Sequence, residues 1–457
     1  MSLLLVRNAA AVPDPPLQPV AAVVTLSSSS LRITATGDAP AGWLSWEIEE
    51  STTGTGSWSN ISTGPATFDK TGLGSGVTRY YRVRGTTNAG QVSAYSAVVD
   101  GTTGTASVKK WDPGHWILPD AQMFPAKYDQ RTNEIALING VSAFKGAELI
   151  VNWGMVETSQ GVYDWSRVDT EIAQLAAMGK KAMLSLWFQS FAGTRADNIY
   201  AHTVNPSYGR VLPLYLETAG YVGTRLEGGI CARLDIAACM DRYIAWIQAC
   251  AARYDSNATV SMVRIAELSN SFSVSEANVA APYSAANWVT QTLRLPLLMQ
   301  QAFPRTGTAT DANFNVSVEA TKAFVAESLL RGHGIAGPDI NVWPDLIEYD
   351  SWNALEYRGA GELGGGLSFS GVDHRGELPC VFDVQVIRTL SCTPKQHLDY
   401  ANQTLGSTHI PWTVYTDTRG GYVRGNVGYN PNFTWEAVKA FCIANPTLAR
   451  TATPSRW

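Results

Sequence analysis

Residues 146–165 read GAELIVNWGMVETSQGVYDW, and residues 179–187 read GKKAMLSLW; these two stretches decide the fold. Each contains an apolar run of strand length, Ala147–Trp153 in the first and Lys181–Trp187 in the second. The sequence between the two runs, Trp165–Met178, is predicted to be helical. A strand, a helix and a second apolar strand in succession indicate a βαβ unit with buried parallel strands.

The same alternation of strands and helices extends from about Lys110 toward the C-terminus. About eight strands over about 350 residues have the size and rhythm of a (β/α)8 TIM barrel. A doubly wound sheet is the alternative, but no glycine-rich turn of the dinucleotide-binding type follows the first strand. The other predicted strands are Gly114–Ile117, Val260–Glu267, Asn313–Glu319, Asn341–Tyr349, Cys380–Gln385 and Trp412–Asp417; the other predicted helices include Ile236–Tyr254, Trp288–Phe303, Lys322–Leu330, Lys395–Leu405 and Trp435–Ala444.

Carboxylates and aromatic rings stand at most of the predicted strand ends. In a TIM barrel the active site is built at the C-terminal ends of the strands, so residues there are candidates by position. Carboxylates beside apolar rings suit glycoside hydrolysis, because one carboxyl group must hold a proton while the other faces an oxocarbenium-like centre. The candidates are Trp153, Trp187, Glu267, Glu319, Trp343, Glu348, Asp383 and Asp417, with Tyr349, Trp352, Trp412 and Tyr415 nearby.

The two opening stretches carry a family resemblance. A strand that ends in Trp153, followed by Glu157, Gly161 and the run Tyr163–Trp165, resembles the second strand and following loop of clan A glycoside hydrolases. Gly179–Trp187 resembles their third strand. The resemblance implies a TIM barrel that hydrolyses O-glycosyl bonds, and it implies a structural role for Glu157.

The resemblance also implies an acid/base residue. In that family it is a Glu at the end of the fourth strand, usually preceded by Asn, and Glu267 matches this position. Ala266 stands where the family has Asn, which contacts the sugar 2-hydroxyl through a bond that strengthens in the transition state. In this chain the contact must come from another residue, and Ser269 or Asn270 could replace the Asn from the loop.

The second carboxylate is less clearly marked. The family has a Glu at the end of strand seven, where this chain has Asp383; Glu348 is its rival and Glu319 a third candidate. Because Asp is one methylene shorter than Glu, it would widen the gap between the two carboxyl groups. A gap of about 5 Å favours retention of configuration, whereas roughly 6.5–9.5 Å leaves room for water and inversion. The stereochemistry therefore stays open.

Residues 13–104 differ in texture from the rest of the chain, since they are rich in Ser, Thr and Gly and form short alternating runs. This pattern predicts an all-β, immunoglobulin-like sandwich. Leu73, seven residues before Tyr80, and the following run Tyr81–Gly90 resemble a fibronectin type III domain. A linker rich in Thr and Gly then leads into the predicted barrel, residues 108–457.

The composition excludes several classes of function. Charged residues make up 16% of the chain, aromatic residues 10%, and the net charge is −5, so no basic surface for nucleic acid is expected. No apolar run reaches the roughly 20 residues of a membrane span. Neither an H-E-x-x-H zinc motif nor a G-x-S-x-G nucleophile motif occurs, and no metal or organic cofactor is implied. Of the six cysteines, mostly expected as buried thiols, Cys380 and Cys392 are the pair to check for a disulfide.

The expected function is therefore hydrolysis of a polysaccharide by Glu267 and a second carboxylate. The alternative is a barrel that binds carbohydrate for attachment to a receptor or cell surface without hydrolysing it, which Ala266 and Asp383 favour. The opening segment is a poor match to a secretory signal. A fibronectin-like module before a glycanase resembles bacteriophage tail proteins, so we expect an extracellular or virion-associated protein whose N-terminal domain contacts other virion or cell-surface proteins.

Overall fold

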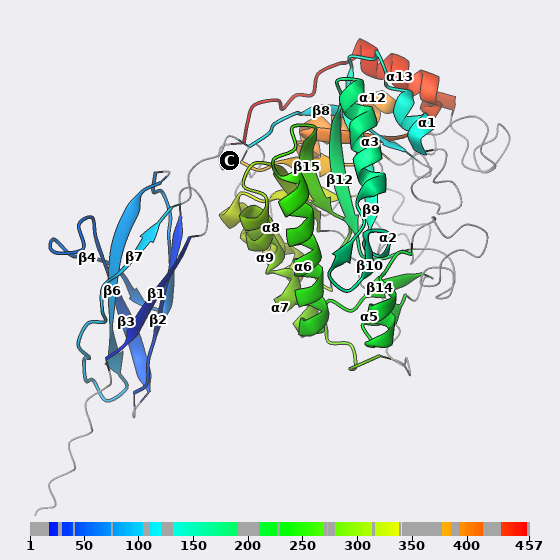
Figure 1. Cartoon of the computed structure of the whole chain (residues 1–457). Coiled ribbons are helices and arrows are strands. Elements are labelled where there is room, and N and C mark those ends of the chain that lie inside the picture. The colour runs from blue at the N-terminus through cyan, green and yellow to red at the C-terminus, as the bar shows by residue number, and fades with distance from the viewer. Residues whose placement is uncertain are drawn as a thin grey trace, which may run out of the picture. The chain divides into compact units, whose positions relative to one another are not determined.

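The computed structural model describes residues 18–25, 30–39, 42–74, 76–103, 109–119, 131–190, 210–225, 229–268, 272, 279–312, 316–337, 340, 377–384, 393–414 and 431–454 (Figure 1). The chain divides into two compact units, Met1–Ser107 and Val108–Trp457. No helix among the described residues is long and apolar enough to cross a membrane.

The N-terminal unit is a sandwich of two antiparallel sheets. One sheet has the order β1-β2-β5 and the other β4-β3-β6-β7. Inward residues of both sheets meet in a single core, which alternation along the strands produces. The strands are β1 (Val20–Thr25), β2 (Leu31–Thr36), β3 (Trp43–Ser51), β4 (Ser59–Gly64), β5 (Thr67–Lys70), β6 (Thr78–Thr87) and β7 (Val99–Thr102).

The core of this unit follows from the period of two. Leu31 and Ile33 of β2 and Ile48 of β3 are fully buried. On β6, Tyr81 is fully buried and donates a hydrogen bond to Glu50 at 3.1 Å, whereas Tyr80 on the opposite face is half-buried. Tyr81 is thus the buried tyrosine of β6, whereas the fibronectin type III resemblance in the sequence rests on the neighbouring Tyr80.

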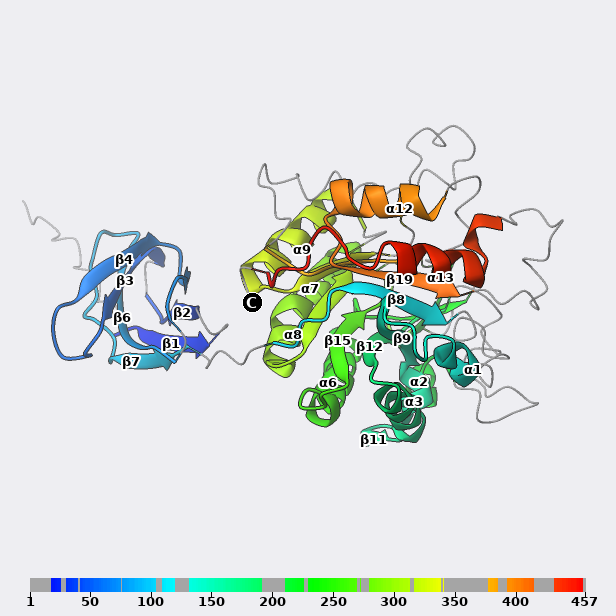
Figure 2. The same cartoon turned by 90° about the horizontal axis from the view of Figure 1, so that it is seen from above.

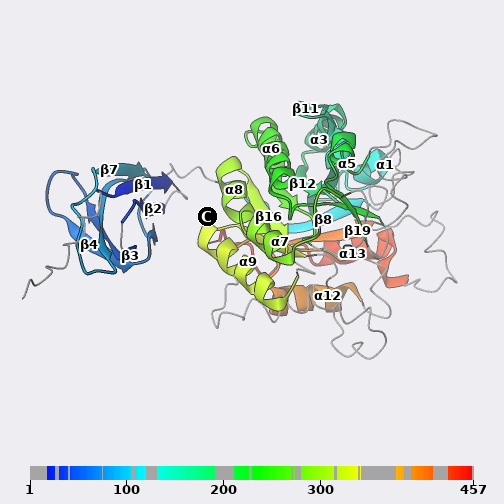
Figure 3. The same cartoon turned by 90° about the horizontal axis from the view of Figure 1, so that it is seen from below.

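The C-terminal unit contains a closed barrel of eight parallel strands in the order β8-β9-β12-β15-β16-β17-β18-β19. Helices lie around the strands (Figures 2 and 3), and a described helix follows every strand except β17. The mixed α/β fold with a parallel barrel is thereby confirmed. The strands are β8 (Gly114–Pro119), β9 (Phe144–Asn152), β12 (Lys181–Trp187), β15 (Val260–Ile265), β16 (Gly307–Asp311), β17 (Gly334–Gly337), β18 (Cys380–Phe382) and β19 (His409–Val414).

The helices supply the outer layer of this unit. Trp246 of α6 and Phe441 of α13 are among the aromatic residues that pack on the outside of the strands. The described helices include α1 (Arg131–Ala136), α2 (Trp153–Val156), α3 (Ser166–Ala177), α5 (Leu214–Thr218), α6 (Ala237–Tyr254), α7 (Ala285–Thr292), α8 (Leu295–Ala302), α9 (Val318–Arg331), α12 (Pro394–Tyr400) and α13 (Trp435–Ala444). A small hairpin of β13 (Val222–Thr224) and β14 (Ile230–Ala232) lies between β12 and α6 in the chain.

The interior of the barrel is filled in layers. One layer is apolar and is formed by Trp116, Met183, Met262, Ala309, Ala336 and Val381 from six different strands. Because side chains alternate along a strand, the next inward position on β15 after Met262 is Arg264, one layer closer to the C-terminal ends. The apolar layer therefore closes the barrel beneath a polar layer.

The fifth and sixth strands are not where the sequence suggested. Residues 313–319 were expected to form a strand that ends in Glu319, but β16 lies earlier, at Gly307–Asp311, and α9 begins at Val318. The reason is local: the Ser317 hydroxyl accepts a hydrogen bond from the Ala320 amide and so caps the helix N-terminus. The sixth strand is β17, whereas the predicted strand 341–349 lies outside the described residues.

Most predicted helices agree with the structure within a few residues, with one division. The stretch predicted as a single helix from Trp288 to Phe303 is two helices, α7 and α8. Pro296 lies in the first turn of α8, where a missing amide proton costs no intrahelical hydrogen bond. Of the cysteines, Cys231, Cys239, Cys250 and Cys442 are buried free thiols, while Cys392 lies outside the described residues.

We predict that Gly146→Ala strongly destabilises the barrel. A Cβ at this position of β9 would lie 1.8 Å from the Lys181 carbonyl oxygen and 2.7 Å from the Trp116 ring, and the backbone of β12 cannot move away without breaking the ladder. Denaturant unfolding should show a loss of about 3 kcal/mol in the barrel transition. Gly56→Ala, where no heavy atom lies within 4 Å, is the control and should leave that transition unchanged.

Candidate active site

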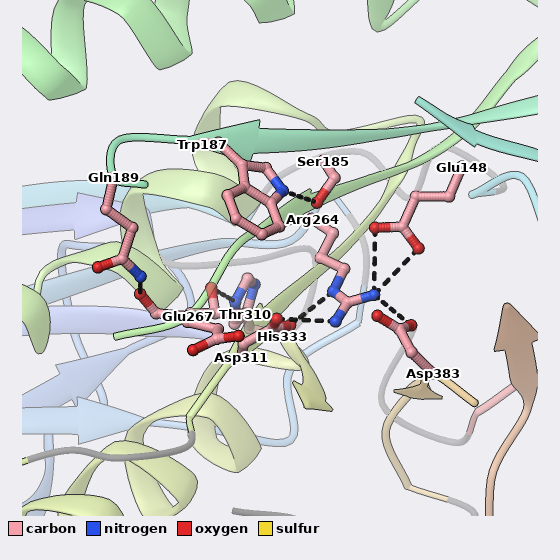
Figure 4. Close-up of polar contacts among 10 residues, drawn as sticks. All are labelled: Glu148, Ser185, Trp187, Gln189, Arg264, Glu267, Thr310, Asp311, His333 and Asp383. Carbon is pink, nitrogen blue, oxygen red and sulfur yellow. Dashed lines mark hydrogen bonds and ion pairs between the residues drawn. The ribbon is translucent and has the colours of Figure 1, made fainter. Parts of the chain in front are cut away.

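A buried arginine organises the polar layer of the barrel. Arg264, on β15, binds the carboxylate of Asp311 on β16 through Nε and Nη2, at 2.5 and 2.7 Å. Its Nη1 lies 3.0 Å from Glu148 on β9 and 2.6 Å from Asp383, which follows β18. Figure 4 shows the guanidinium group between the three carboxylates. One cation thus joins four strands, and we call these four residues the Arg264 cluster.

The charges of the Arg264 cluster do not balance when all four groups are ionised. Arginine keeps its charge in proteins, and three carboxylates face it, all of them buried. Burial raises the pKa of Glu148, Asp311 and Asp383 above the ordinary carboxyl range, and Arg264 only partly offsets this for each of them. Glu148 also raises the pKa of Asp383. The cluster therefore retains protons at a pH at which exposed carboxyl groups have lost theirs.

Glu267 lies at the edge of this cluster. It is two residues beyond the end of β15 and is buried with 9% of its surface exposed, against 4% or less for the four residues of the cluster. Its backbone amide interacts with the Asp311 carboxylate and lowers the pKa of that group, against the larger effect of burial. Gln189 donates a hydrogen bond to the Glu267 carbonyl oxygen at 2.7 Å. The structure thus places Glu267 beside the cluster that contains Asp383.

Trp187 is the predicted sugar platform whose position fits that role. It ends β12, is half-buried, and its indole Nε1 donates to Ser185 Oγ at 3.0 Å. Ser185 in turn pairs in register with Arg264 on the neighbouring strand. Figure 4 shows the ring on the same side of the cluster as Gln189. An anchored indole with an accessible part can stack on a sugar.

Trp153 and Trp412 do not fit the platform role that the sequence suggested. Trp153 is fully buried in the outer layer, stacked on Trp246 of α6 with ring centroids 5.6 Å apart. Trp412 is also buried outside the barrel, where it packs on Phe441 of α13 and donates to His115 at 3.0 Å. Protein covers both rings, so neither offers a face to a ligand.

Of the remaining candidates, Glu319 lies on a helix and not at a strand end, and the others lie outside the described residues. Glu319 is in the first turn of α9 and exposed, so the expectation that it ends a strand is wrong. The others cannot be placed relative to the site: Glu348, Trp343, Tyr349, Asp417, Trp352 and Tyr415 lie outside the described residues.

The sequence reasoning missed Glu148 and Asp311 as members of the site. A signal was present, because Glu148 is a charged residue inside an apolar strand and Arg264 is another. A charge in a buried strand requires a partner of opposite sign. Two such residues on different strands of one barrel therefore indicate an ion pair in its interior.

The described residues contain no group of three or more His, Cys, Asp or Glu side chains arranged to hold a metal ion. Within the Arg264 cluster the guanidinium group occupies the position between the carboxylates. The arrangement raises the pKa values of buried carboxyl groups, so they can hold protons at a pH at which exposed carboxyl groups are ionised.

We predict that Glu148→Gln reduces the pH dependence of stability. A carboxyl group with a raised folded pKa stabilises the fold at a pH below its unfolded pKa of about 4, and this contribution is lost as pH rises through the folded pKa. The free energy of unfolding should thus fall as pH rises from the unfolded pKa of about 4 through the raised folded pKa in the wild type, and fall less in the variant. Chemical denaturation at several pH values measures this. Glu436→Gln, at an exposed ion pair, is the control and should keep the wild-type slope.

Comparisons with known proteins identify similar folds for a small part of the chain. No protein-family model and no curated protein matches it. The sixth fibronectin type III domain of human fibronectin type III domain containing protein 3 is 20% identical over 22% of this chain and 93% of that one, with a TM-score of 0.19. The fourth fibronectin type III domain of a human protein is 24% identical, over 23% and 92%, with a TM-score of 0.20. A β-1,2-glucanase from Parabacteroides distasonis is 17% identical, over 21% and 14%, with a TM-score of 0.18.

Proposed function

We propose that this protein is a glycoside hydrolase that cleaves a polysaccharide, with Glu267 as the general acid/base and Asp383 as the second carboxylate. The observation that carries the proposal is the position of both residues just beyond the C-terminal ends of barrel strands: Asp383 pairs with the buried Arg264, and the backbone of Glu267 contacts Asp311 of the same cluster. This is the end of a parallel barrel at which active sites form. Trp187 at a third strand end supplies an aromatic ring.

The two carboxyl groups have different surroundings, which suits different roles. Asp383 is buried with Arg264 Nη1 at 2.6 Å, so the guanidinium group stabilises its ionised form, the form that a nucleophile or base needs. Burial and Glu148 favour the protonated form of Asp383. Activity should therefore rise with pH as Asp383 ionises, at a pH above the ordinary carboxyl range.

A second candidate function is carbohydrate binding without hydrolysis. Ala266, buried where clan A enzymes have Asn, removes a contact that strengthens in their transition state. The ion pair between Asp383 and Arg264 also satisfies the carboxylate without a substrate. An attachment protein could keep the barrel and Trp187 while lacking turnover.

We further propose an extracellular or virion-associated location, such as a bacteriophage tail, in which the N-terminal unit acts as a spacer or attachment module of the fibronectin type III kind. Two antiparallel sheets around a single core support this assignment of the unit. The location rests on the analogy of domain order alone.

We predict that Glu267→Gln abolishes turnover and retains binding. Removal of a general acid costs about 10²- to 10⁴-fold in kcat, because proton transfer to the leaving group is lost while the shape of the site is kept. Reducing-sugar release from a panel of bacterial-surface and plant polysaccharides measures turnover, and calorimetry measures binding. Asp383→Asn should lower kcat similarly.

Glu319→Gln is the matched control, since Glu319 is an exposed carboxylate on α9. It should leave kcat unchanged. Equal release by Glu267→Gln and the wild type would exclude Glu267 as the acid. No release from any polysaccharide, together with binding to one, would favour the attachment protein.

A further inference from the structure

The backbone around Glu267 is held from both sides. The Ala266 amide donates to the Leu186 carbonyl on β12 at 3.1 Å, and the Leu268 amide donates to the Asp311 carbonyl on β16 at 3.0 Å. Between these two bonds, the Glu267 carbonyl accepts from the side-chain amide of Gln189 at 2.7 Å. The first two of these contacts join backbone to backbone just beyond the end of β15, and the Glu267 amide also contacts the Asp311 carboxylate. The third depends on one side chain.

Gln189 is itself fixed in a single orientation. It is buried, and its Oε1 accepts from Arg225 Nη1 at 2.6 Å. An arginine can only donate, so the amide oxygen must face Arg225 and the amide nitrogen must face Glu267. Rotation of the amide group by 180° would place oxygen against a carbonyl oxygen and N–H against N–H. Arg225 therefore fixes the orientation of the Gln189 amide in which its N–H group faces the Glu267 carbonyl.

Arg225 belongs to the β13–β14 hairpin, which is tied to β12 and to the chain beyond Glu267. The Ser190 amide donates to the Ile230 carbonyl at 2.8 Å, and the Ala232 amide donates to the Phe188 carbonyl at 3.0 Å. The backbone of Arg225 forms an isolated antiparallel β-bridge with that of Phe272, five residues beyond Glu267. The hairpin thus contacts both the segment after β12 and the segment after β15. Figure 4 shows Gln189 with its amide group directed at Glu267.

We propose that Gln189 and Arg225 are positioning residues for Glu267, through which the β13–β14 hairpin sets the direction of the acid/base carboxyl group. This inference rests on the proposed function of Glu267. A general acid must lie within hydrogen-bond reach of the leaving oxygen, and a displacement of 1 Å can cost about 10²-fold in rate. Loss of Gln189 removes this hydrogen bond to the Glu267 carbonyl, and the side chain moves with its own backbone.

The test compares Gln189→Met with the wild type in two measurements. Met keeps the length and bulk of the side chain and removes the donor. The first measurement is the pKa of the Glu267 carboxyl group by ¹³C NMR of glutamate-labelled protein, with the signal assigned from its absence in Glu267→Gln; it needs no substrate. The second is the separation of kcat from KM on a cleaved polysaccharide.

Gln300→Met is the matched control. Gln300 is half-buried, and its Nε2 donates to the Gly332 carbonyl at 3.0 Å and to Thr308 Oγ1 at 2.8 Å, so its substitution removes a bond of the same type, together with one to a hydroxyl group, from another part of the barrel unit. If Gln189→Met does not fold, Arg225→Lys replaces it, because Lys keeps the positive charge and is too short to hold the amide oxygen as Arg225 does.

The expected result is a shifted Glu267 pKa and a kcat lowered by about 10²-fold at nearly constant KM in Gln189→Met, with both unchanged in Gln300→Met. An unshifted Glu267 pKa in folded Gln189→Met, or a kcat within about twofold of the wild type, would overturn the inference. Failure of the proposed function gives a different result. Glu267→Gln would then release as much sugar as the wild type, or neither protein would release any. The NMR comparison would still show whether Gln189 positions the Glu267 carboxyl group.

Discussion

The guanidinium group of Arg264 is the feature on which the rest of the barrel interior depends. It binds carboxylates from β9, from β16 and from the residue after β18, so one side chain of β15 connects strands that lie apart in the closed sheet. Removing one partner of a buried ion pair typically costs about 3–5 kcal/mol, because the remaining charge stays buried without compensation. The apolar layer of Met183 and Met262 beneath it keeps water from the other side. The ion pairs of the Arg264 cluster thus hold together the layer of residues beneath the proposed site.

The Arg264 cluster also affects the protonation of the proposed site. Three buried carboxylates around one cation cannot all ionise as readily as exposed ones, so protons are held where the proposed reaction would use them. Glu267 lies at the edge of the same cluster through its backbone contact with Asp311, and its carbonyl accepts from Gln189, which contacts Arg225 of the β13–β14 hairpin. The proposed acid/base is therefore linked both to the charged interior of the barrel and to a hairpin that is outside the barrel strands.

Some strands and helices of this arrangement were predictable from the sequence, and those that were not have a physical reason. The strand Lys181–Trp187 and the helix Trp435–Ala444 agree with the structure at both ends, because apolar runs and caps are local signals. The stretch Asn313–Glu319 alternates polar and apolar residues as a strand does, yet Ser317 caps a helix inside it. A short alternation and a helix start compete within the same few residues, and the contacts of α9 with its surroundings decide between them.

The sequence by itself determined the alternation of strands and helices that builds the barrel, and it located Glu267 at a strand end, since both follow from local patterns. Only the tertiary structure decided which carboxylates meet Arg264, because Asp311, Glu148 and Asp383 are 47, 116 and 119 residues away from it. It also decided that Trp187 borders the site while Trp153 and Trp412 lie beneath helices. A strand-end tryptophan faces inward or outward according to register and closure of the barrel, which no local stretch of sequence contains.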